Sequence, residues 1–409
     1  MKNTFISKEQ NRNKKVLFCS VCVMSNQRPS SHPEHLKKNV NDIKYASFNK
    51  QNKSNNFICH ACLYNKQKRK LNWSDRNSEF LEIVKKIKKN KKNNNKYDCV
   101  VPGSGGKDSQ WVALKLREHG LNPLCVTWSP AIFTNVGMKN LKSWKKKFDH
   151  ILFKPKKEVH QKITKEAFLN LGNPFQSFVM GMKSIGIRYA MNLGIKYVFY
   201  GENPAENHND IKELQSSKQS LEYFTSETLE NIFYGGIPRN EFIKKYKFKP
   251  SDLDCFTPVN RKLFLDSGVE SHYMSHFFYW DSQRNYYEVR DKLGFNTNPD
   301  GRSEGTYTSQ SSLDDKLDGQ NYYLMYIKFG QGRAVSDACK DIRDGYITRD
   351  EAIEIIRKYD HEFPKKYFND FLKYIGINKK LYFNTIDKFR AKNLWKFENN
   401  KWKLKHIVK

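Results

Sequence analysis

Short apolar runs alternate with longer amphipathic stretches through the middle of the chain. Apolar runs bounded by turn residues are typical of buried strands, and apolar residues at three- and four-residue spacing are typical of helices. The pattern predicts strands at 97–102, 123–128, 149–154 and 195–201, and helices at 108–119, 156–170 and 176–193. Because strands and helices alternate, we expect a largely parallel sheet with helices on both faces.

The segments on either side of this alternation have different patterns. Residues 78–89 place apolar side chains at helical spacing, and the Lys/Asn-rich run 88–96 reads as an exposed turn or linker. From about residue 321 the pattern is mainly helical, and Thr348 with Glu351 forms a capping box that marks one helix start. We therefore expect three parts: 1–95, 96–290 and 291–409.

Composition and charge add limits on the class of protein. The 409-residue chain carries a net charge of +30. Many of its lysines occur in runs that also contain asparagine, and no RNA-binding signature accompanies them. We interpret the charge as a solvated surface, with a nucleic-acid partner as the less favoured alternative. No run of about 18 apolar residues occurs, and the polar stretch 1–15 lacks the apolar centre of a secretion signal. We therefore expect a cytoplasmic protein with no membrane partner.

Four of the eight cysteines form two CxxC pairs near the amino terminus: Cys19 with Cys22, and Cys59 with Cys62. In a reducing compartment such pairs favour a metal site over disulfides, and two of them supply the four thiolates of a structural Zn²⁺ site. Three histidines could replace a cysteine as ligand: His32, His35 and His60. A redox role for one pair is the remaining alternative. A four-ligand site would be closed to substrate and would serve to fold the first part of the chain.

The stretch VVPGSGGKDS at residues 100–109 reads as a strand, a tight turn and the start of a helix. It matches neither the Walker A pattern nor G-x-G-x-x-G, because Val101 and Asp108 stand where those patterns need glycine. Glycines let the backbone approach an anion, and successive N–H groups at a helix start form an anion-binding nest. We expect the phosphate donors to be Ser104, Gly105, Gly106, Lys107 and Ser109. Asp108 is better suited to hold Mg²⁺ or to cap the helix.

Further polar residues are candidates by position. Thr127, Gly201, Glu202 and Asn203 follow or end predicted strands, where parallel sheets bind ligands. Asp314 and Asp315 either hold Mg²⁺ or position phosphates, or they form a helix cap or a solvated turn.

Two more features have ordinary structural explanations. His272 and His276 have helical spacing but no third ligand nearby, so substrate contact or a core hydrogen bond suits them better than zinc. The aromatic run HFFYW at 276–280 reads as core.

The six residues SGGKDS resemble the pyrophosphate loop S-G-G-x-D-S of the ATP pyrophosphatases, in the same strand–helix context. The resemblance implies an α/β fold in which a Rossmann-like PP-loop domain over 96–290 binds ATP and transfers AMP to a substrate oxygen. It also implies that Lys107 and Asp108 are catalytic, with Lys107 stabilising the departing pyrophosphate and Asp108 holding Mg²⁺. The helical part 291–409 would complete the substrate site, and the zinc module would precede the domain.

Longer stretches resemble the N-acetyl sugar amidotransferases of bacterial surface-polysaccharide and flagellin-glycan pathways. They include YGENPAEN at 200–207, the segment 256–281, the segment 301–353 and YDHEFP at 359–364, together with the CxxC pairs. The resemblance implies that the acetamido oxygen of an activated N-acetyl sugar is adenylated and that ammonia displaces AMP to give an acetamidino group. The sugar stays open between a nucleotide-linked hexose and a nonulosonic acid. Three arginines would face phosphates or a sugar carboxylate: Arg302, Arg333 and Arg343.

The ammonia source follows from the same resemblance. No cysteine of the chain has the setting of a glutaminase nucleophile, so we expect no glutaminase activity in this chain. The resemblance implies two separate partners, a glutaminase subunit and an ammonia-channelling barrel subunit.

Two other functions compete with this interpretation. Some tRNA-modifying thiolases also place CxxC pairs before an S-G-G-x-D-S loop, and the positive charge favours them, but they usually need further paired cysteines. A non-catalytic scaffold of a glutaminase complex is the other alternative, and the intact loop argues against it.

Overall fold

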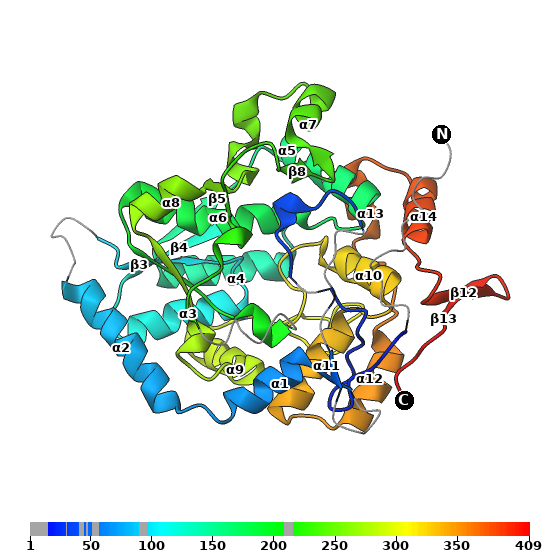
Figure 1. The fold of residues 1–409 in the computed structure, drawn as a ribbon, viewed down its shortest axis with the longest axis horizontal. Coiled ribbons are helices and arrows are strands. Elements are labelled where there is room, and N and C mark those ends of the chain that lie inside the picture. The colour runs from blue at the N-terminus through cyan, green and yellow to red at the C-terminus, as the bar shows by residue number, and fades with distance from the viewer. Residues whose placement is uncertain are drawn as a thin grey trace.

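A five-stranded parallel sheet forms the centre of the computed structural model, which describes residues 15–29, 31–40, 45, 48–50, 57–89, 96–207 and 216–409 (Figure 1). In spatial order its strands are β11 (Glu270–Tyr273), β6 (Tyr197–Tyr200), β3 (Cys99–Pro102), β4 (Pro123–Trp128) and β5 (His150–Phe153). Every neighbouring pair is parallel, which confirms the predicted sheet type. Four of the strands overlap predicted ones, whereas β11 is not among the predictions.

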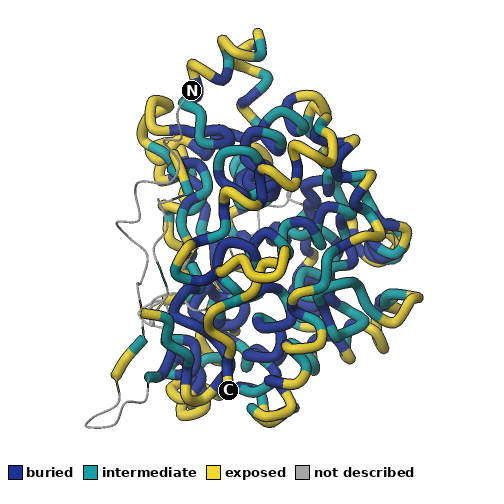
Figure 2. The backbone as a smooth tube through the Cα atoms, turned by 90° about the vertical axis from the view of Figure 1, so that its right-hand side faces the viewer, coloured by how far each residue is buried: buried dark blue, intermediate teal, exposed yellow. Residues whose placement is uncertain are grey.

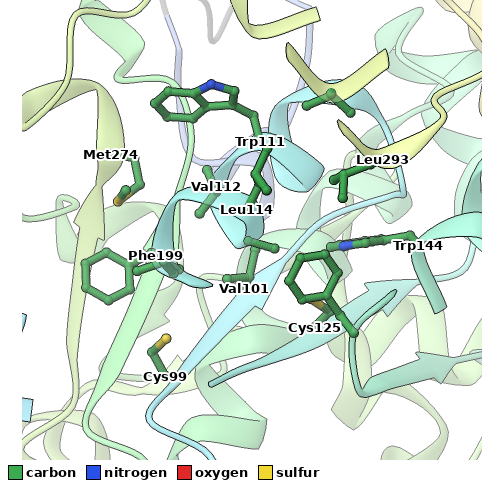
Figure 3. Close-up of a cluster of buried hydrophobic side chains, with 14 of the residues drawn as sticks. Cys99, Val101, Trp111, Val112, Leu114, Cys125, Trp144, Phe199, Met274 and Leu293 are labelled. Atoms are coloured by element: carbon green, nitrogen blue, oxygen red, sulfur yellow. The ribbon is translucent and has the colours of Figure 1, made fainter. Parts of the chain in front are cut away.

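Helices cover both faces of the sheet. Successive residues of a strand point to opposite sides, and apolar residues occur on both sides, so both faces have to be covered. Cys99 and Val101 pack on one face and Val100 packs on the other. The first face carries α2 (Trp73–Lys89), α3 (Lys107–Glu118), α4 (Asn135–Lys147) and α9 (Ser282–Leu293). Figure 3 shows Trp111, Trp144 and Leu293 from three of these helices around the strand residues. The second face carries α5 (Lys157–Glu166), α6 (Gln176–Leu193), α7 (Arg239–Tyr246) and α8 (Arg261–Ser267).

The helices predicted for this region are present as α3, α5 and α6. The predicted helix at 156–170 consists of α5 followed by a π-helical turn, Ala167–Leu171. The structure also contains α4 and α9, which the hydrophobic pattern did not predict. Both begin at a capped residue, Thr134 and Asp281, whose side chains accept hydrogen bonds from backbone N–H groups of the first turn.

The carboxyl-terminal part is mainly helical, as predicted, and ends in a hairpin. Its elements are α10 (Asp318–Phe329), α11 (Arg333–Asp344), α12 (Arg349–Tyr359), α13 (Phe368–Ile375), α14 (Lys379–Lys388), β12 (Trp395–Glu398) and β13 (Lys401–Leu404). The predicted capping box is confirmed at the start of α12. Helices α10, α13 and α14 pack around Phe168 and Phe175, whereas α11 and α12 pack on the cysteine-rich segment.

The amino-terminal segment is short and irregular, and it lies against α11 and α12 in Figure 1. It contains η1 (Glu34–Leu36), β1 (Phe48–Lys50), β2 (Phe57–Cys59) and α1 (His60–Lys68). Of the predicted linker at 88–96, residues 88 and 89 instead end α2, and residues 90–95, like the stretch 1–14, lie outside the described residues. The predicted helix at 78–89 lies within α2, and its side chains Phe80, Val84 and Ile87 are buried in the core around β3, whereas Leu81 is exposed.

Short elements complete the chain between β6 and α9. They are η3 (Pro204–Asn207), η5 (Leu221–Tyr223), β7 (Thr225–Ser226), β8 (Phe233–Tyr234), β9 (Ile237–Pro238), η6 (Pro250–Phe256), β10 (Val259–Asn260) and η7 (Met274–His276). Figure 2 shows buried residues through the interior and exposed residues along the outer turns. No helix in the described ranges is both long and apolar enough to cross a bilayer.

The strand order places a ligand crevice at one position of the sheet. From β3 the chain moves outward through β4 to β5, and it then returns to β6 on the opposite side of β3. The connections that follow β3 and β6 therefore diverge, and parallel sheets bind ligands beyond the carboxyl ends of strands at such a point.

Candidate functional site

The loop between β3 and α3 depends on its glycines. A Cβ atom on Gly103 would lie 2.1 Å from Cβ of Ser109, and Gly105 has φ +97°, which L side chains rarely adopt. The N–H of Gly103 donates to the carbonyl of Val126 at 3.0 Å, which ties the loop to the neighbouring strand. Gly106 is the N-cap of α3, so the free N–H groups of that helix start directly at the loop.

A cavity of about 680 Å³ opens at this helix start. The loop contributes Ser104, Gly106, Lys107, Asp108 and Ser109 to its wall, the end of β6 contributes Gly201 and Glu202, and the carboxyl-terminal part contributes Asp314 and Asp315. The amino-terminal segment around η1 and the helix α6 form other parts of the wall. The structure thus brings most of the sequence candidates into one site.

The charged and hydroxyl groups of the loop already have partners. The Lys107 ammonium donates to Asp108 at 2.6 Å and to the hydroxyl of Ser282 at 2.8 Å. The Ser109 hydroxyl donates to the carbonyl of Gly106 at 3.0 Å, and the Ser104 hydroxyl donates to Asp314. The arrangement offers one fixed cation and a helix start to an anion, with two carboxylates beside them.

The neighbouring carboxylates Asp314 and Asp315 make different contacts. Asp315 accepts hydrogen bonds from the N–H groups of Ala131, Ile132 and Leu317 at 2.5, 3.3 and 3.0 Å, so it holds two segments together as a turn residue does. Asp314 contacts the loop through Ser104, and a Cβ on Gly106 would lie 3.2 Å from its Oδ2. Asp314 is therefore the carboxylate of the pair that is placed to act on a ligand of the loop.

Burial disfavours the charged form of both carboxylates. It raises the pKa of Asp314 to about 6, with a further contribution from the charge of Asp108 and an opposing one from the Ser104 hydroxyl. Burial raises the pKa of Asp315 to about 7, against the effect of its three backbone donors. An ionised Asp314 at neutral pH is therefore costly to the fold, and a bound cation would offset that cost.

Replacing Asp314 by asparagine should stabilise the ligand-free protein above pH 6. The pKa of Asp314 is about 6 in the folded chain and about 4 in an unfolded one, so between these values the folded chain binds more protons and its stability falls as pH rises. Asparagine keeps the shape but does not titrate. Urea unfolding from pH 4 to 7.5 should show the variant gaining up to about 3 kcal/mol over the wild type. A difference that stays constant with pH would contradict the assignment.

The strand-end candidates fall into two groups. Glu202 accepts from the ammonium of Lys340 at 2.8 Å and from the amide of Asn207, and a Cβ on Gly201 would lie 2.8 Å from the Trp280 ring. Burial opposes ionisation of Glu202, but Lys340 and Asn207 hold its pKa below the ordinary value.

Asn203 and Thr127 do not line the cavity. The Asn203 side chain accepts from the N–H of Ala205 at 2.8 Å and shapes the turn η3. The Thr127 hydroxyl is buried within hydrogen-bond distance of His150, at 2.9 Å, on the face covered by α4.

Sequence reasoning missed Lys340, Ser282 and Asp318, all of which line the cavity. On α11 the charged residues Arg333, Asp337 and Lys340 recur at intervals of four and three, which puts them on one helix face, while Ala334 and Ala338 pack on the cysteine-rich segment. That spacing is the available signal, but it is equally typical of a solvated helix face.

The remaining candidates have structural partners. Arg302 forms a two-pronged ion pair with Glu362 at 2.6 and 2.8 Å, and Arg333 is held by Asp337 and the Tyr322 hydroxyl. Arg343 donates to the carbonyl of Glu206 and does not line the cavity.

The histidine and aromatic candidates also belong to the core. His272 lies near Ser217 and Glu270, and His276 near Arg76 and Glu79. Phe277 and Trp280 are buried, which confirms the interpretation of the aromatic run as core.

The four CxxC cysteines form one buried cluster. Their sulfur atoms all lie within 4.8 Å of one another, with 3.9 Å between Cys19 and Cys62 and 3.7 Å between Cys22 and Cys59. Tetrahedral Zn²⁺ with Zn–S bonds of about 2.3 Å requires sulfur atoms about 3.8 Å apart, so these residues fit that metal. The bound ion would be closed to substrate. His32 and His35 line the large cavity instead, and His60 contacts Asn49.

A buried lysine connects this cluster to the cavity wall. Helix α1 begins directly after Cys59 and ends at Lys68, which is 0% exposed. The Lys68 ammonium donates to Glu206 at 2.8 Å and to the carbonyl of Trp280 at 2.9 Å. Glu206 lies in the same turn as Asn207, the partner of Glu202, so the cysteine cluster supports one wall of the site.

A known family model matches the carboxyl-terminal quarter of the chain. Residues 304–409 match the family model described as the C-terminal domain of LPS biosynthesis protein WbpG-like proteins. That span contains Asp314, Arg333 and Lys340 of the cavity wall. A search of curated proteins finds no match.

Proposed function

We propose that this protein is an ATP-dependent amidotransferase of bacterial surface-glycan biosynthesis, acting on an activated N-acetyl sugar. The observation that carries the proposal is the meeting of two sequence regions in one cavity. The SGGKDS loop contributes its helix start and Lys107, and the region similar to the WbpG-like C-terminal domain contributes Asp314 and Lys340. The name of that model, which refers to LPS biosynthesis, supports the glycan class of substrate.

The reaction proposed has two steps. The acetamido oxygen of the sugar attacks the α-phosphorus of ATP, the bond between the α- and β-phosphates breaks, and pyrophosphate leaves with its electron pair. Ammonia then adds to the activated carbon, and AMP leaves with the former amide oxygen, so the neutral amide becomes a positively charged amidine. Both steps need a stabilised leaving group more than covalent participation by the protein.

The residues of the cavity would divide this work. Lys107 and the first N–H groups of α3 would bind the departing pyrophosphate. Asp108 and Asp314, which both line the cavity, would hold Mg²⁺, whose charge would neutralise the phosphates. Glutamine-derived ammonia would come from a separate glutaminase subunit through an ammonia-channelling barrel subunit. The cysteine cluster would hold a structural Zn²⁺ with no part in the chemistry.

The distribution of cysteines argues against a sulfur-transferring alternative. All eight cysteines are among the described residues and none lines the cavity, so none is placed to carry sulfur to a substrate there. A tRNA thiolase therefore has less support than the amidotransferase, and it enters the test as a competing outcome.

Pyrophosphate release is the test of the proposal. The protein would be incubated with ATP, Mg²⁺ and ammonium chloride, in parallel with a panel of activated N-acetyl sugars and with unmodified tRNA, and products would be analysed by mass spectrometry. We expect release that depends on one sugar class, with the amide oxygen replaced by NH. Release only with tRNA would favour the thiolase, and no release in any arm would favour a scaffold.

A further inference from the structure

Lys340 is a cation of the cavity wall that the sequence did not predict. It lies on α11, its ammonium is 2.8 Å from Glu202 Oε1, and its side chain is 22% exposed on the cavity wall that also includes the SGGKDS loop. Of the other charged α11 residues that line the cavity, Arg333 binds Asp337 through Nε, and Asp341 accepts hydrogen bonds from Gln283 and Tyr307. Within the part of the chain that the structure describes, the ion-pair partner of Lys340 is Glu202, which is itself a cavity residue.

The charges beside the loop are balanced in a way that leaves little attraction for a polyanion. Lys107 is paired with Asp108 at 2.6 Å, Lys340 is paired with Glu202, and Asp314 adds a carboxylate next to Ser104. ATP brings several negative charges into this region. Its phosphates therefore need a cation besides Lys107. A metal ion bound to Asp108 would take the carboxylate that is now paired with Lys107.

The two ion pairs are close enough to influence each other. Burial alone would lower the pKa of Lys340, but the charge of Glu202 and, more weakly, those of Asp337 and Asp108 raise it, so the amine stays protonated. The charge of Lys107 likewise contributes to the lowered pKa of Glu202, after the effects of burial, Lys340 and Asn207. An anion bound at the loop is thus within the electrostatic range of Lys340.

We propose that Lys340 is a second phosphate-binding cation. When ATP binds, the Lys340 ammonium exchanges its partner Glu202 for the β,γ-pyrophosphate portion of the nucleotide. A lysine ammonium has three donors on a flexible stem, so it can exchange partners without movement of the helix. The inference rests on the proposed function, because it assumes that the loop binds ATP. It assigns to the WbpG-like C-terminal region a direct contact with the nucleotide in addition to its place in the fold.

Equilibrium binding separates this role from a structural ion pair. Binding of ATP, AMP and inorganic pyrophosphate, each with Mg²⁺, would be measured by calorimetry for the wild type and for Lys340→Ala. Loss of a hydrogen bond to a charged group predicts roughly 10- to 100-fold weaker binding of ATP and pyrophosphate. AMP, which lacks the two terminal phosphates, should change less than about 2-fold, and Lys340→Arg should keep most of the affinity. Lys358→Ala, an exposed lysine of α12 outside the cavity, is the control for lost charge.

Lys340→Ala also leaves Glu202 unpaired beside the phosphates, and repulsion by that carboxylate could weaken ATP binding by itself. Two variants of Glu202 test for this effect. Glu202→Gln should bind ATP several-fold more tightly than the wild type, because Lys340 no longer has a competing partner. The double variant Glu202→Gln with Lys340→Ala should stay weak. If the double variant recovers wild-type affinity, repulsion by Glu202 explains the loss and the inference is wrong.

The failure of the inference can be told from the failure of the proposed function. If Lys107→Ala loses ATP binding while Lys340→Ala keeps it, the loop binds ATP and Lys340 has no part in it. If the wild type does not bind ATP at all, the proposed function itself falls.

Discussion

Replacing Lys107 by alanine should reduce pyrophosphate release from ATP by roughly 10²- to 10³-fold, the cost typical of removing one preorganised donor from a developing anion. Lys107 is the first residue of α3, and its ammonium is held by the Ser282 hydroxyl at 2.8 Å, so it is already oriented towards the cavity. Because negative charge grows on the pyrophosphate as it leaves, the loss should appear mainly in kcat. Steady-state release with ammonium and the active sugar is the measurement.

The control for the lost charge is Lys139→Ala. Lys139 is an exposed lysine of α4 outside the cavity, so this variant should retain wild-type rates. Lys107→Arg should recover only part of the rate, since the planar guanidinium presents its donors differently from an ammonium. Full activity in Lys107→Ala would remove the loop from the proposed chemistry.

Loss of the metal from the cysteine cluster should unfold the amino-terminal segment. Cys19, Cys22 and Cys59 are fully buried, and four uncoordinated thiols contribute far less than structural Zn²⁺, whose binding in small zinc domains is worth about 10 to 16 kcal/mol. The purified protein should contain one zinc per chain by elemental analysis. Cys22→Ser should lose it, with a large drop in melting temperature.

The matched control is Cys255→Ser, which changes a half-buried cysteine outside the cluster and should keep the zinc and the melting temperature. A chelator should act on the wild type as Cys22→Ser does. ATP binding should weaken in both cases, because Lys68 at the end of α1 binds Glu206, in the turn whose Asn207 lines the cavity. A metal-free protein with unchanged melting would show that the cluster is an ordinary packed core.

The fold around the loop was predictable because its signals are local. A buried strand, a glycine turn and a helix start follow one another between residues 99 and 118, and β4 and α6 occupy the residues predicted for them. Helix α4 was missed although it has local signals: Leu141 and Trp144 are buried at helical spacing, and Thr134 caps the first turn. Strand β11 consists of Glu270, Ser271, His272 and Tyr273, so it lacks the apolar run of the predicted strands, and its position depends on pairing with β6.

The site was predictable only in part, because contacts between distant segments have no local pattern. Asp314 lies more than 200 residues from Ser104, and only the fold distinguishes its role from that of Asp315. Residues that follow β6 line the cavity, but alternation along a strand decides which side chains reach it. Thr127 therefore points into the core towards His150, whereas Glu202, just beyond β6, faces the cavity.

The packing of the cysteine segment on α11 and α12 sets a constraint on synthesis of the protein. Val23, Met24 and Ile58 are covered by residues that begin at Ala334, about 270 positions after Cys62. At translation rates of 5 to 20 residues per second, roughly 15 to 55 s pass between the synthesis of Cys62 and that of the residues that cover this surface. During that interval the thiols are open to metal or to oxidation, while their apolar neighbours are open to aggregation. Early capture of zinc would hold the segment in its final shape until the last quarter of the chain emerges from the ribosome.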